Sequence, residues 1–104
     1  MKKLISLDML DELWQLPLMI VLKHSVVCAR STYALWAVEE FEEQRPDLPV
    51  YVLRIQVFPG LSKRVEERSG VRHASPQALV LRQGAVAAVA SEDDITVDWL
   101  YQQV

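Results

Sequence analysis

Cysteine is almost absent from this sequence: Cys28 is the only one in 104 residues. A single cysteine excludes a disulfide within the chain, and it excludes a zinc or iron–sulfur site built from several cysteines of one chain. Histidine is scarce too, and two histidines with one cysteine are too few to predict a metal site. So little cysteine suits a reducing compartment, and we expect a cytoplasmic protein.

Two further absences limit the possible partners. No apolar run approaches the roughly 20 residues that a membrane-spanning helix needs, and Asp8, Asp11 and Glu12 interrupt the stretch that a signal peptide would require. No basic stripe is visible and the net charge is −3, so neither nucleic acid nor a membrane is an expected partner. With 51% hydrophobic and 24% charged residues, residues 1–104 are predicted to form a single domain.

Hydrophobic periodicity alternates between helical and strand patterns along the whole chain. Ser6 is a favourable N-cap, Gly70 is a favourable helix terminator, and Gly84 between two short apolar runs indicates a tight hairpin. The pattern predicts helices over 6–15, 29–43 and 61–69, a last helix capped by Ser91 or Thr96, and strands over 17–23, 50–57, 77–82 and 85–90.

This element order predicts an α/β protein with a thioredoxin-like arrangement. The expected sheet is mixed and four-stranded, with two parallel strands plus an antiparallel hairpin, flanked by helices. The near-continuous apolar run over 17–23 indicates an interior strand, whereas the half-polar alternation over 50–57 indicates an edge strand. Tyr33 is assigned to the core face of its helix, and Trp36 is also expected in the core.

Cys28 lies at the junction between the apolar strand and the following helix, where it opens a C-x-x-S motif that ends at Ser31. The unpaired N–H groups and the positive dipole end of a helix N-terminus stabilise a thiolate, the reactive form of cysteine. A buried cysteine that only fills space is the alternative for this residue type. The junction and the spacing favour Cys28 as a catalytic nucleophile.

A second feature is the pair Ser75-Pro76, just before the third predicted strand. X-Pro bonds are cis in only about 5–6% of folded cases, but in thioredoxin-like folds a cis-proline loop at this point faces the catalytic cysteine. Such a loop leaves a backbone edge free to pair with an extended substrate chain. An ordinary trans proline starting a strand is the alternative. We expect Ser75 and Pro76 to bind substrate.

Three residues near Cys28 are candidates for stabilising its thiolate. Ser31, at the position of the resolving cysteine in dithiol enzymes, can donate a hydrogen bond to the sulfur but cannot form a disulfide. Arg30 can lend positive charge, with a solvated side chain as an equal alternative. His24 can shift the local potential or transfer a proton, with a packed histidine at a strand end as the alternative.

The segment Lys23-His24-Ser25-Val26-Val27-Cys28-Ala29-Arg30-Ser31, with Ser75-Pro76-Gln77-Ala78 downstream, resembles the YtxJ-type monothiol bacilliredoxins over essentially the whole chain. That family commonly has Thr-Arg before the cysteine and proline after it, whereas this chain has Val26, Val27 and Ala29. The resemblance implies a thioredoxin-fold protein whose Cys28 removes bacillithiol from protein mixed disulfides. No bound cofactor is implied, because bacillithiol itself is the thiol co-substrate and bacillithiol-modified proteins are the partners.

Two other functions remain open on the sequence. A monothiol glutaredoxin-like protein uses one cysteine per chain, with a small thiol, to hold an iron–sulfur cluster across a dimer; Ala29-Arg30 replaces the Gly-Phe usual there, which argues against this function. The third possibility is a non-catalytic thioredoxin-like binding module in which Cys28 is inert.

Overall fold

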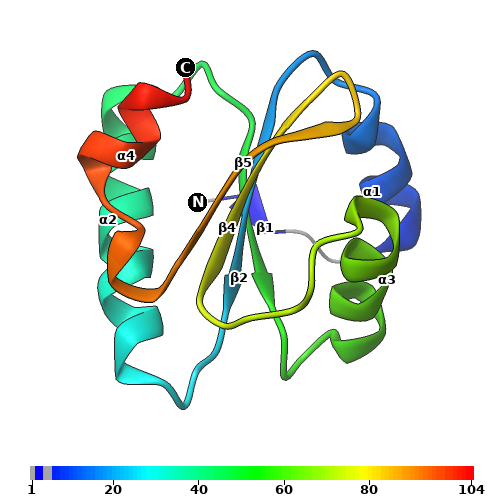
Figure 1. The fold of residues 1–104 in the computed structure, drawn as a ribbon, viewed down its shortest axis with the longest axis horizontal. Helices are drawn as coiled ribbons and strands as arrows, with labels where there is room; N and C mark the ends of the chain where they lie inside the picture. Colours follow the sequence, from blue (N-terminus) through cyan, green and yellow to red (C-terminus); the bar gives the residue numbers. More distant parts are fainter. Residues whose placement is uncertain (1, 4–5) are drawn as a thin grey trace.

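Helices and strands alternate along the chain until two strands form a hairpin near its end (Figure 1). The computed structural model describes residues 2–3 and 6–104. Its elements are β1 (Lys2–Lys3), α1 (Leu7–Trp14), β2 (Met19–His24), α2 (Ala29–Gln44), β3 (Val50–Arg54), α3 (Pro59–Ser69), β4 (Gln77–Arg82), β5 (Ala85–Ser91), the 3₁₀ turn η1 (Glu92–Asp94) and α4 (Val97–Gln102).

The sheet has five strands in the order β1-β3-β2-β4-β5, so the prediction of four strands is corrected. The expected parallel pair is confirmed in β2 and β3, and the expected antiparallel hairpin in β4 and β5. The additional strand, Lys2–Lys3, pairs in parallel with β3. Two exposed lysines show no alternation of apolar and polar residues, so the sequence does not predict a strand there. They become a strand because β3 offers unpaired backbone groups on that side.

The expectation that the second long strand lies at an edge is wrong, because β3 lies between β1 and β2. It is also shorter than predicted and ends at Arg54. The backbone N–H groups of Val57 and Phe58 both donate to the carbonyl oxygen of Arg54, at 3.2 and 3.0 Å. This turn directs the chain into α3 and leaves Gln56 in a loop at the end of the sheet.

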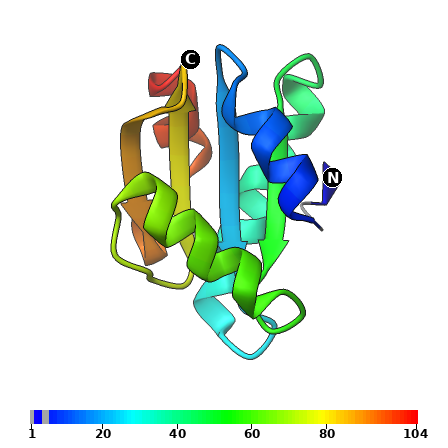
Figure 2. The same cartoon turned by 90° about the vertical axis from the view of Figure 1, so that its right-hand side faces the viewer.

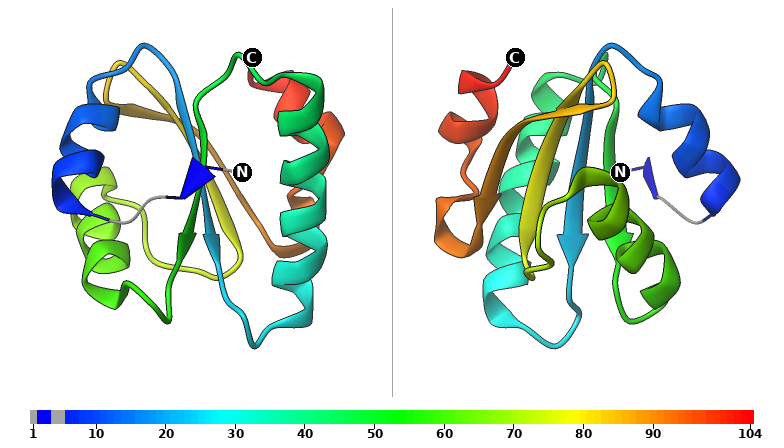
Figure 3. Two further views of the ribbon diagram at one scale, coloured as in Figure 1. Left: turned by 180° about the vertical axis from the view of Figure 1, so that it is seen from behind. Right: turned by 45° about the vertical axis from the view of Figure 1, so that its right-hand side comes forward.

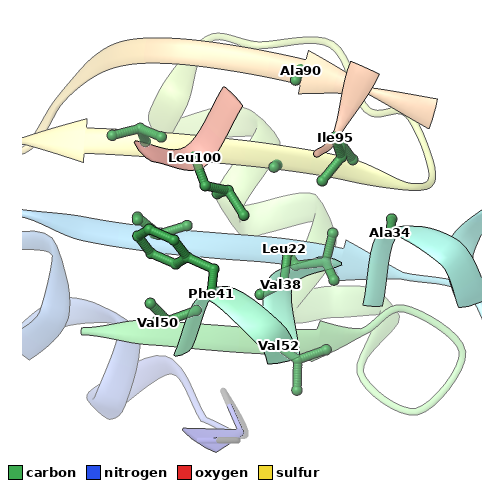
Figure 4. Close-up of a cluster of buried hydrophobic side chains, with 12 residues drawn as sticks. Leu22, Ala34, Val38, Phe41, Val50, Val52, Ala90, Ile95 and Leu100 are labelled. Atoms are coloured by element: carbon green, nitrogen blue, oxygen red, sulfur yellow. The ribbon is translucent and has the colours of Figure 1, made fainter. Parts of the chain in front are cut away.

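Helices cover both faces of the sheet, with α2 and α4 on one side and α1 and α3 on the other (Figures 1 and 2). Each face has its own buried cluster. The cluster under α2 and α4 is shown in Figure 4, where Phe41 and Val38 of α2 lie over the sheet in the same cluster as Leu22 of β2. The other cluster joins Leu10 of α1 and Val65 of α3 to the opposite face. The side chains of β2 pack alternately into the two clusters, which explains why its sequence is continuously apolar.

Tyr33 and Trp36 are the clear exceptions to the predicted core. Their exposed fractions are 65% and 59%, so assigning them to the core was wrong. Their rings meet edge to face on the outside of α2, with centroids 5.5 Å apart. The buried stripe of α2 instead runs through Ser31, Ala34, Val38 and Phe41.

The helix ends follow the local signals. Ser6 accepts a hydrogen bond from Met9 N–H, and Thr96 accepts one from Trp99 N–H, so Thr96 rather than Ser91 caps the last helix. Gly70 ends α3 with a φ of 72°, in the left-handed region that glycine adopts freely. None of the helices in the described ranges is long and apolar enough to cross a membrane.

Candidate active site around Cys28

One end of the sheet brings together the segments that carry the candidate residues. The strands β2 and β3 end there and the antiparallel β4 begins there, at the lower end of Figures 1 and 2. Across β2 and β4, Lys23 is paired with Gln77, so His24 and Pro76 occupy the next positions toward this end. The topology therefore places the approach to Cys28 and the proline segment at the same end.

Cys28 is the N-cap residue of α2, with an extended backbone (φ −112°, ψ 123°). Its side chain is partly exposed and makes no capping hydrogen bond to the helix. The sulfur is therefore at the end of α2 where N–H groups and the positive end of the dipole favour an anion. The position expected from the sequence, between a buried strand and a helix start, is confirmed.

A small hydrogen-bond network holds the loop that leads to Cys28. The side-chain amide of Gln56 donates to Ser25 Oγ at 2.6 Å, and its Oε1 accepts from the N–H of Val26 at 3.2 Å. The N–H of Val27 donates to Ser25 Oγ at 3.4 Å. The loop between β2 and α2 is thus tied to the loop after β3. Sequence reasoning missed Gln56, because nothing in the order of residues pairs position 56 with position 25.

Ser31 is completely buried in the first turn of α2. Its Oγ accepts a hydrogen bond from the N–H of Ser25 at 3.2 Å, and its own N–H donates to the carbonyl of Cys28 at 3.1 Å. The hydroxyl therefore fastens both ends of the Cys28 loop together. Where a dithiol enzyme would have its resolving cysteine, this chain has a structural serine.

Arg30 forms an ion pair with Glu92, the first residue of η1, with 2.7 Å between Nη1 and Oε2. Both side chains are about half exposed, so the pair contributes little to stability. Glu92 also donates its N–H to the carbonyl of Pro76, at 3.1 Å. The start of α2 is thereby connected through Glu92 to the proline segment. The negative charge of Glu92 offsets the positive charge that Arg30 was expected to lend.

The Ser75-Pro76 peptide bond is cis. Pro76 is buried, and its carbonyl oxygen is the acceptor for Glu92. The Oγ of Ser75 is buried without a hydrogen-bond partner among the described residues. These two residues precede β4 directly, at the same end of the sheet as Cys28.

His24 is buried at the end of β2, with 7% of its surface exposed. Burial lowers the pKa of His24 below its usual value, the nearby positive charge of Arg54 lowers it further, and Glu39 partly opposes both. The imidazole is therefore mainly neutral near pH 7. In this state it supplies no positive charge to Cys28.

Lys23 points to the opposite face of the sheet, toward α3, and is fully buried. Its Nζ donates to the carbonyl of Ser62 at 3.1 Å and lies 3.1 Å from His73 Nδ1. Burial lowers the pKa of Lys23, and the carboxylate of Glu66 partly opposes that effect. Burial and the facing Lys23 likewise lower the pKa of His73. This pair could not be predicted from the sequence, because lysine is rarely buried.

Comparisons with known proteins agree with this arrangement. The model of the family "Monothiol bacilliredoxin BrxC" matches residues 2–100. One solved structure, described as a candidate oxidoreductase with a thioredoxin fold, is 31% identical with a TM-score of 0.91, covering 98% of this chain and 91% of the other.

More distant structures share only the fold. The thioredoxins of Plasmodium falciparum and of Fasciola hepatica are each 14% identical, with a TM-score of 0.77, covering 98% of this chain and 94% of theirs. The thioredoxin-like fold predicted from the element order is confirmed. By its match over nearly the whole chain, together with the single cysteine at the start of α2, this protein belongs to the monothiol bacilliredoxin family.

Proposed function

We propose that this protein is a monothiol thiol-disulfide oxidoreductase that removes bacillithiol from protein mixed disulfides. The observation that carries the proposal is the position of the only cysteine: partly exposed, at the N-cap of α2, at the same end of the sheet as the cis Ser75-Pro76 bond. A thiolate at a helix N-terminus with solvent access is the form of cysteine that attacks disulfides.

In the first step, the thiolate of Cys28 attacks the bacillithiol sulfur of the modified protein. The bond between bacillithiol and the protein sulfur breaks, the protein thiolate leaves, and Cys28 now carries bacillithiol in a mixed disulfide. In the second step, the thiolate of a free bacillithiol attacks the sulfur of the bound one. Cys28 leaves as a thiolate and bacillithiol disulfide is released. Overall one free bacillithiol thiol is consumed: its sulfur is oxidised to the disulfide while the sulfur of the substrate protein is reduced to the thiol.

The single cysteine requires that second external thiol, because Ser31 cannot resolve the mixed disulfide and its hydroxyl is hydrogen-bonded to Ser25. Within this proposal Ser31 and Arg30 support the Cys28 loop and its charge, and His24 acts nearby as a neutral group. Ser75 and Pro76 receive the backbone of the substrate protein. The proposed reaction needs a reducing compartment that contains bacillithiol, so a cytoplasmic location is part of the proposal.

The experiment is intact-mass spectrometry after mixing the reduced protein with a purified model protein that carries bacillithiol on one cysteine. We expect the bacillithiol mass on this chain and release of the unmodified model protein. Added free bacillithiol should then return Cys28 to the thiol. The Cys28→Ser variant is the matched control and should acquire no adduct.

Failure to form the adduct, with the protein folded and reduced, would contradict the proposal. The same preparation then separates the other functions. Visible absorbance after incubation with iron, sulfide and a small thiol would indicate a glutaredoxin-like cluster protein. Slow alkylation of Cys28, at the rate of an ordinary exposed thiol, would indicate a binding module.

A further inference from the structure

Three neighbouring parallel strands end in basic residues on one face of the sheet. Lys3 is the last residue of β1, Arg54 of β3 and His24 of β2. His24 is paired directly with Arg54, while Lys3 is paired with Val52, two residues before Arg54. Because side chains two residues apart on a strand share a face, all three lie on the side covered by α2. Figure 3 (left) shows β1 beside β3, with α2 on this side.

A cavity of about 160 Å³ separates these strand ends from α2. Its lining consists of Lys3, His24, Leu35, Glu39, Val52 and Arg54. Its volume corresponds to roughly five water molecules at about 30 Å³ each, enough for an anion of a few heavy atoms. The region just beyond the carboxyl ends of parallel strands is also where open α/β sheets bind ligands.

His24, one of the residues lining this cavity, has a polar atom that lacks a partner. Its side chain is more than nine-tenths buried, and Nδ1 has no hydrogen-bond partner among the described residues. Buried polar atoms in proteins are nearly always hydrogen-bonded, because an unpaired one costs its full desolvation. A residue that lines the cavity therefore has a nitrogen whose hydrogen-bonding capacity is unused.

The charges around the cavity determine whether it favours an anion or a cation. Lys3 and Arg54 contribute two positive charges and Glu39 one negative charge, while the neutral His24 contributes none. The ion pairs of residues 2–3 and 6–104 involve other side chains, which leaves both cations able to interact with a ligand. A cation would be repelled by this excess, whereas an anion would be attracted.

We propose that this cavity binds a small oxyanion, a phosphate or a carboxylate, with Arg54 and Lys3 supplying the positive charge and His24 donating a hydrogen bond from Nδ1. The planar guanidinium fork of Arg54 matches the two oxygens of either group. The apolar walls formed by Leu35 and Val52 keep the ligand small. Which nitrogen of neutral His24 carries the proton is then fixed by the bound acceptor.

Apart from His24, the residues that line the cavity take no part in the thiol chemistry proposed for Cys28. Leu35 and Glu39 lie on the second and third turns of α2, roughly 10 and 16 Å along the helix axis from Cys28 at 1.5 Å per residue. The two proposals therefore stand or fall independently. Loss of anion binding would leave the bacillithiol transfer intact, and loss of that transfer would leave the anion site intact.

The test is a titration of the full chain with inorganic phosphate, followed through the imidazole C–H signals of its two histidines by NMR. His24 should shift with saturation. Its pKa should rise, because a bound anion stabilises the imidazolium that burial and Arg54 now disfavour. His73 provides the internal control, since it faces Lys23 on the α3 side of the sheet and should keep its pKa.

Four variants sharpen the test. Arg54→Gln should weaken phosphate binding about tenfold or more, equivalent to the loss of one charge-assisted contact. Glu39→Gln should tighten it, because it removes the only negative charge lining the cavity. Arg64→Gln is the matched control: Arg64 is an exposed arginine of α3 paired with Glu67, and its loss should leave binding unchanged. Lys3→Gln repeats the Arg54 test if that variant does not fold.

Acetate, titrated in the same way, distinguishes the two classes of oxyanion. Saturation with phosphate alone supports a phosphate site, saturation with acetate alone supports a carboxylate site, and saturation with both supports a general oxyanion site. Linear shifts of both histidines with either anion, or equal binding by the Arg54→Gln and Arg64→Gln variants, would overturn the proposal.

Discussion

The hydroxyl of Ser31 accepts a hydrogen bond from the backbone N–H of Ser25 across the loop that holds Cys28, at 3.2 Å. Both residues are buried, and between them lie the exposed Val26 and Val27 and the partly exposed Cys28. This hydrogen bond joins the two residues that flank the loop and so holds its two ends together. This gives the last residue of the C-x-x-S motif a role in the shape of the loop.

Ser31→Ala should lower the free energy of unfolding by about 1 to 2 kcal/mol, because it leaves the buried N–H of Ser25 without its acceptor. Urea unfolding measures this change. Thr32→Ala is the matched control, one residue further along α2 and exposed, and should change stability by less than about 0.5 kcal/mol. Equal stability of the two variants would show that the Ser31 hydroxyl does not hold the loop.

Gln56→Ala should loosen the same loop from its other side. Both functional groups of the Gln56 amide are engaged, one with Ser25 Oγ and one with the N–H of Val26. Hydrogen exchange at the Val26 amide should become roughly five- to tenfold faster when these bonds are lost. Gln15→Ala, at the exposed end of α1, is the control and should leave this amide unchanged.

Arg30→Gln and Glu92→Gln should move the reactivity of Cys28 in opposite directions. The first removes a positive charge two residues from Cys28, and the second releases that charge from its ion pair. We expect alkylation of Cys28 to slow in Arg30→Gln and to quicken in Glu92→Gln, each by about two- to fivefold at low salt. Stability should change by less than about 1 kcal/mol in both. The same direction in both variants would rule out a charge effect.

Stability should fall as the pH is lowered from about 7.5 to about 5.5. Both histidines have pKa values below their usual range in the folded chain: burial is the largest cause in each, with Arg54 adding to it at His24 and Lys23 at His73. The unfolded chain therefore binds protons at a higher pH than the folded chain. Their contribution is complete above the usual histidine pKa and is lost as the pH falls toward the folded values. Urea unfolding across this range measures the slope.

Lys23→Met tests the cause at His73. Removing the facing ammonium should raise the pKa of His73 toward its usual value and reduce the pH slope, because the like charge is gone. The pKa of His24 should not change, since its side chain lies on the other face of the sheet. NMR titration of both histidines reports the two values together. An unchanged pKa of His73 would mean that burial alone sets it.

The helices and their ends could be predicted because their signals are local. Ser6 and Thr96 each accept a hydrogen bond from an N–H three residues later, and the N–H of Gly70 donates to a carbonyl four residues earlier. A short window of sequence therefore contains the information. The position of Cys28 follows for the same reason, since the apolar strand before it and the helix after it each show their own period.

The exposed Tyr33 and Trp36 show where periodicity is insufficient. Several faces of α2 carry apolar residues, so the sequence alone does not say which face meets the sheet. The packing of Ala34, Val38 and Phe41 against β2 and β3 settles that question. The pairing of Lys2–Lys3 with β3 could not be predicted for a similar reason. Two residues are too few to show a hydrophobic period, and they form a strand only because β3 lies beside them.

The α/β order, the helix caps and the position of Cys28 at the start of a helix follow from the sequence alone, because each depends on residues close together in the chain. Three other features became visible only in the folded chain: Gln56 holds Ser25, Lys23 faces His73, and one cavity is lined by Lys3, Arg54 and His24. Those contacts join residues between about 20 and 50 positions apart. Which of them meet is fixed by strand order and register, which form only when the whole sheet assembles.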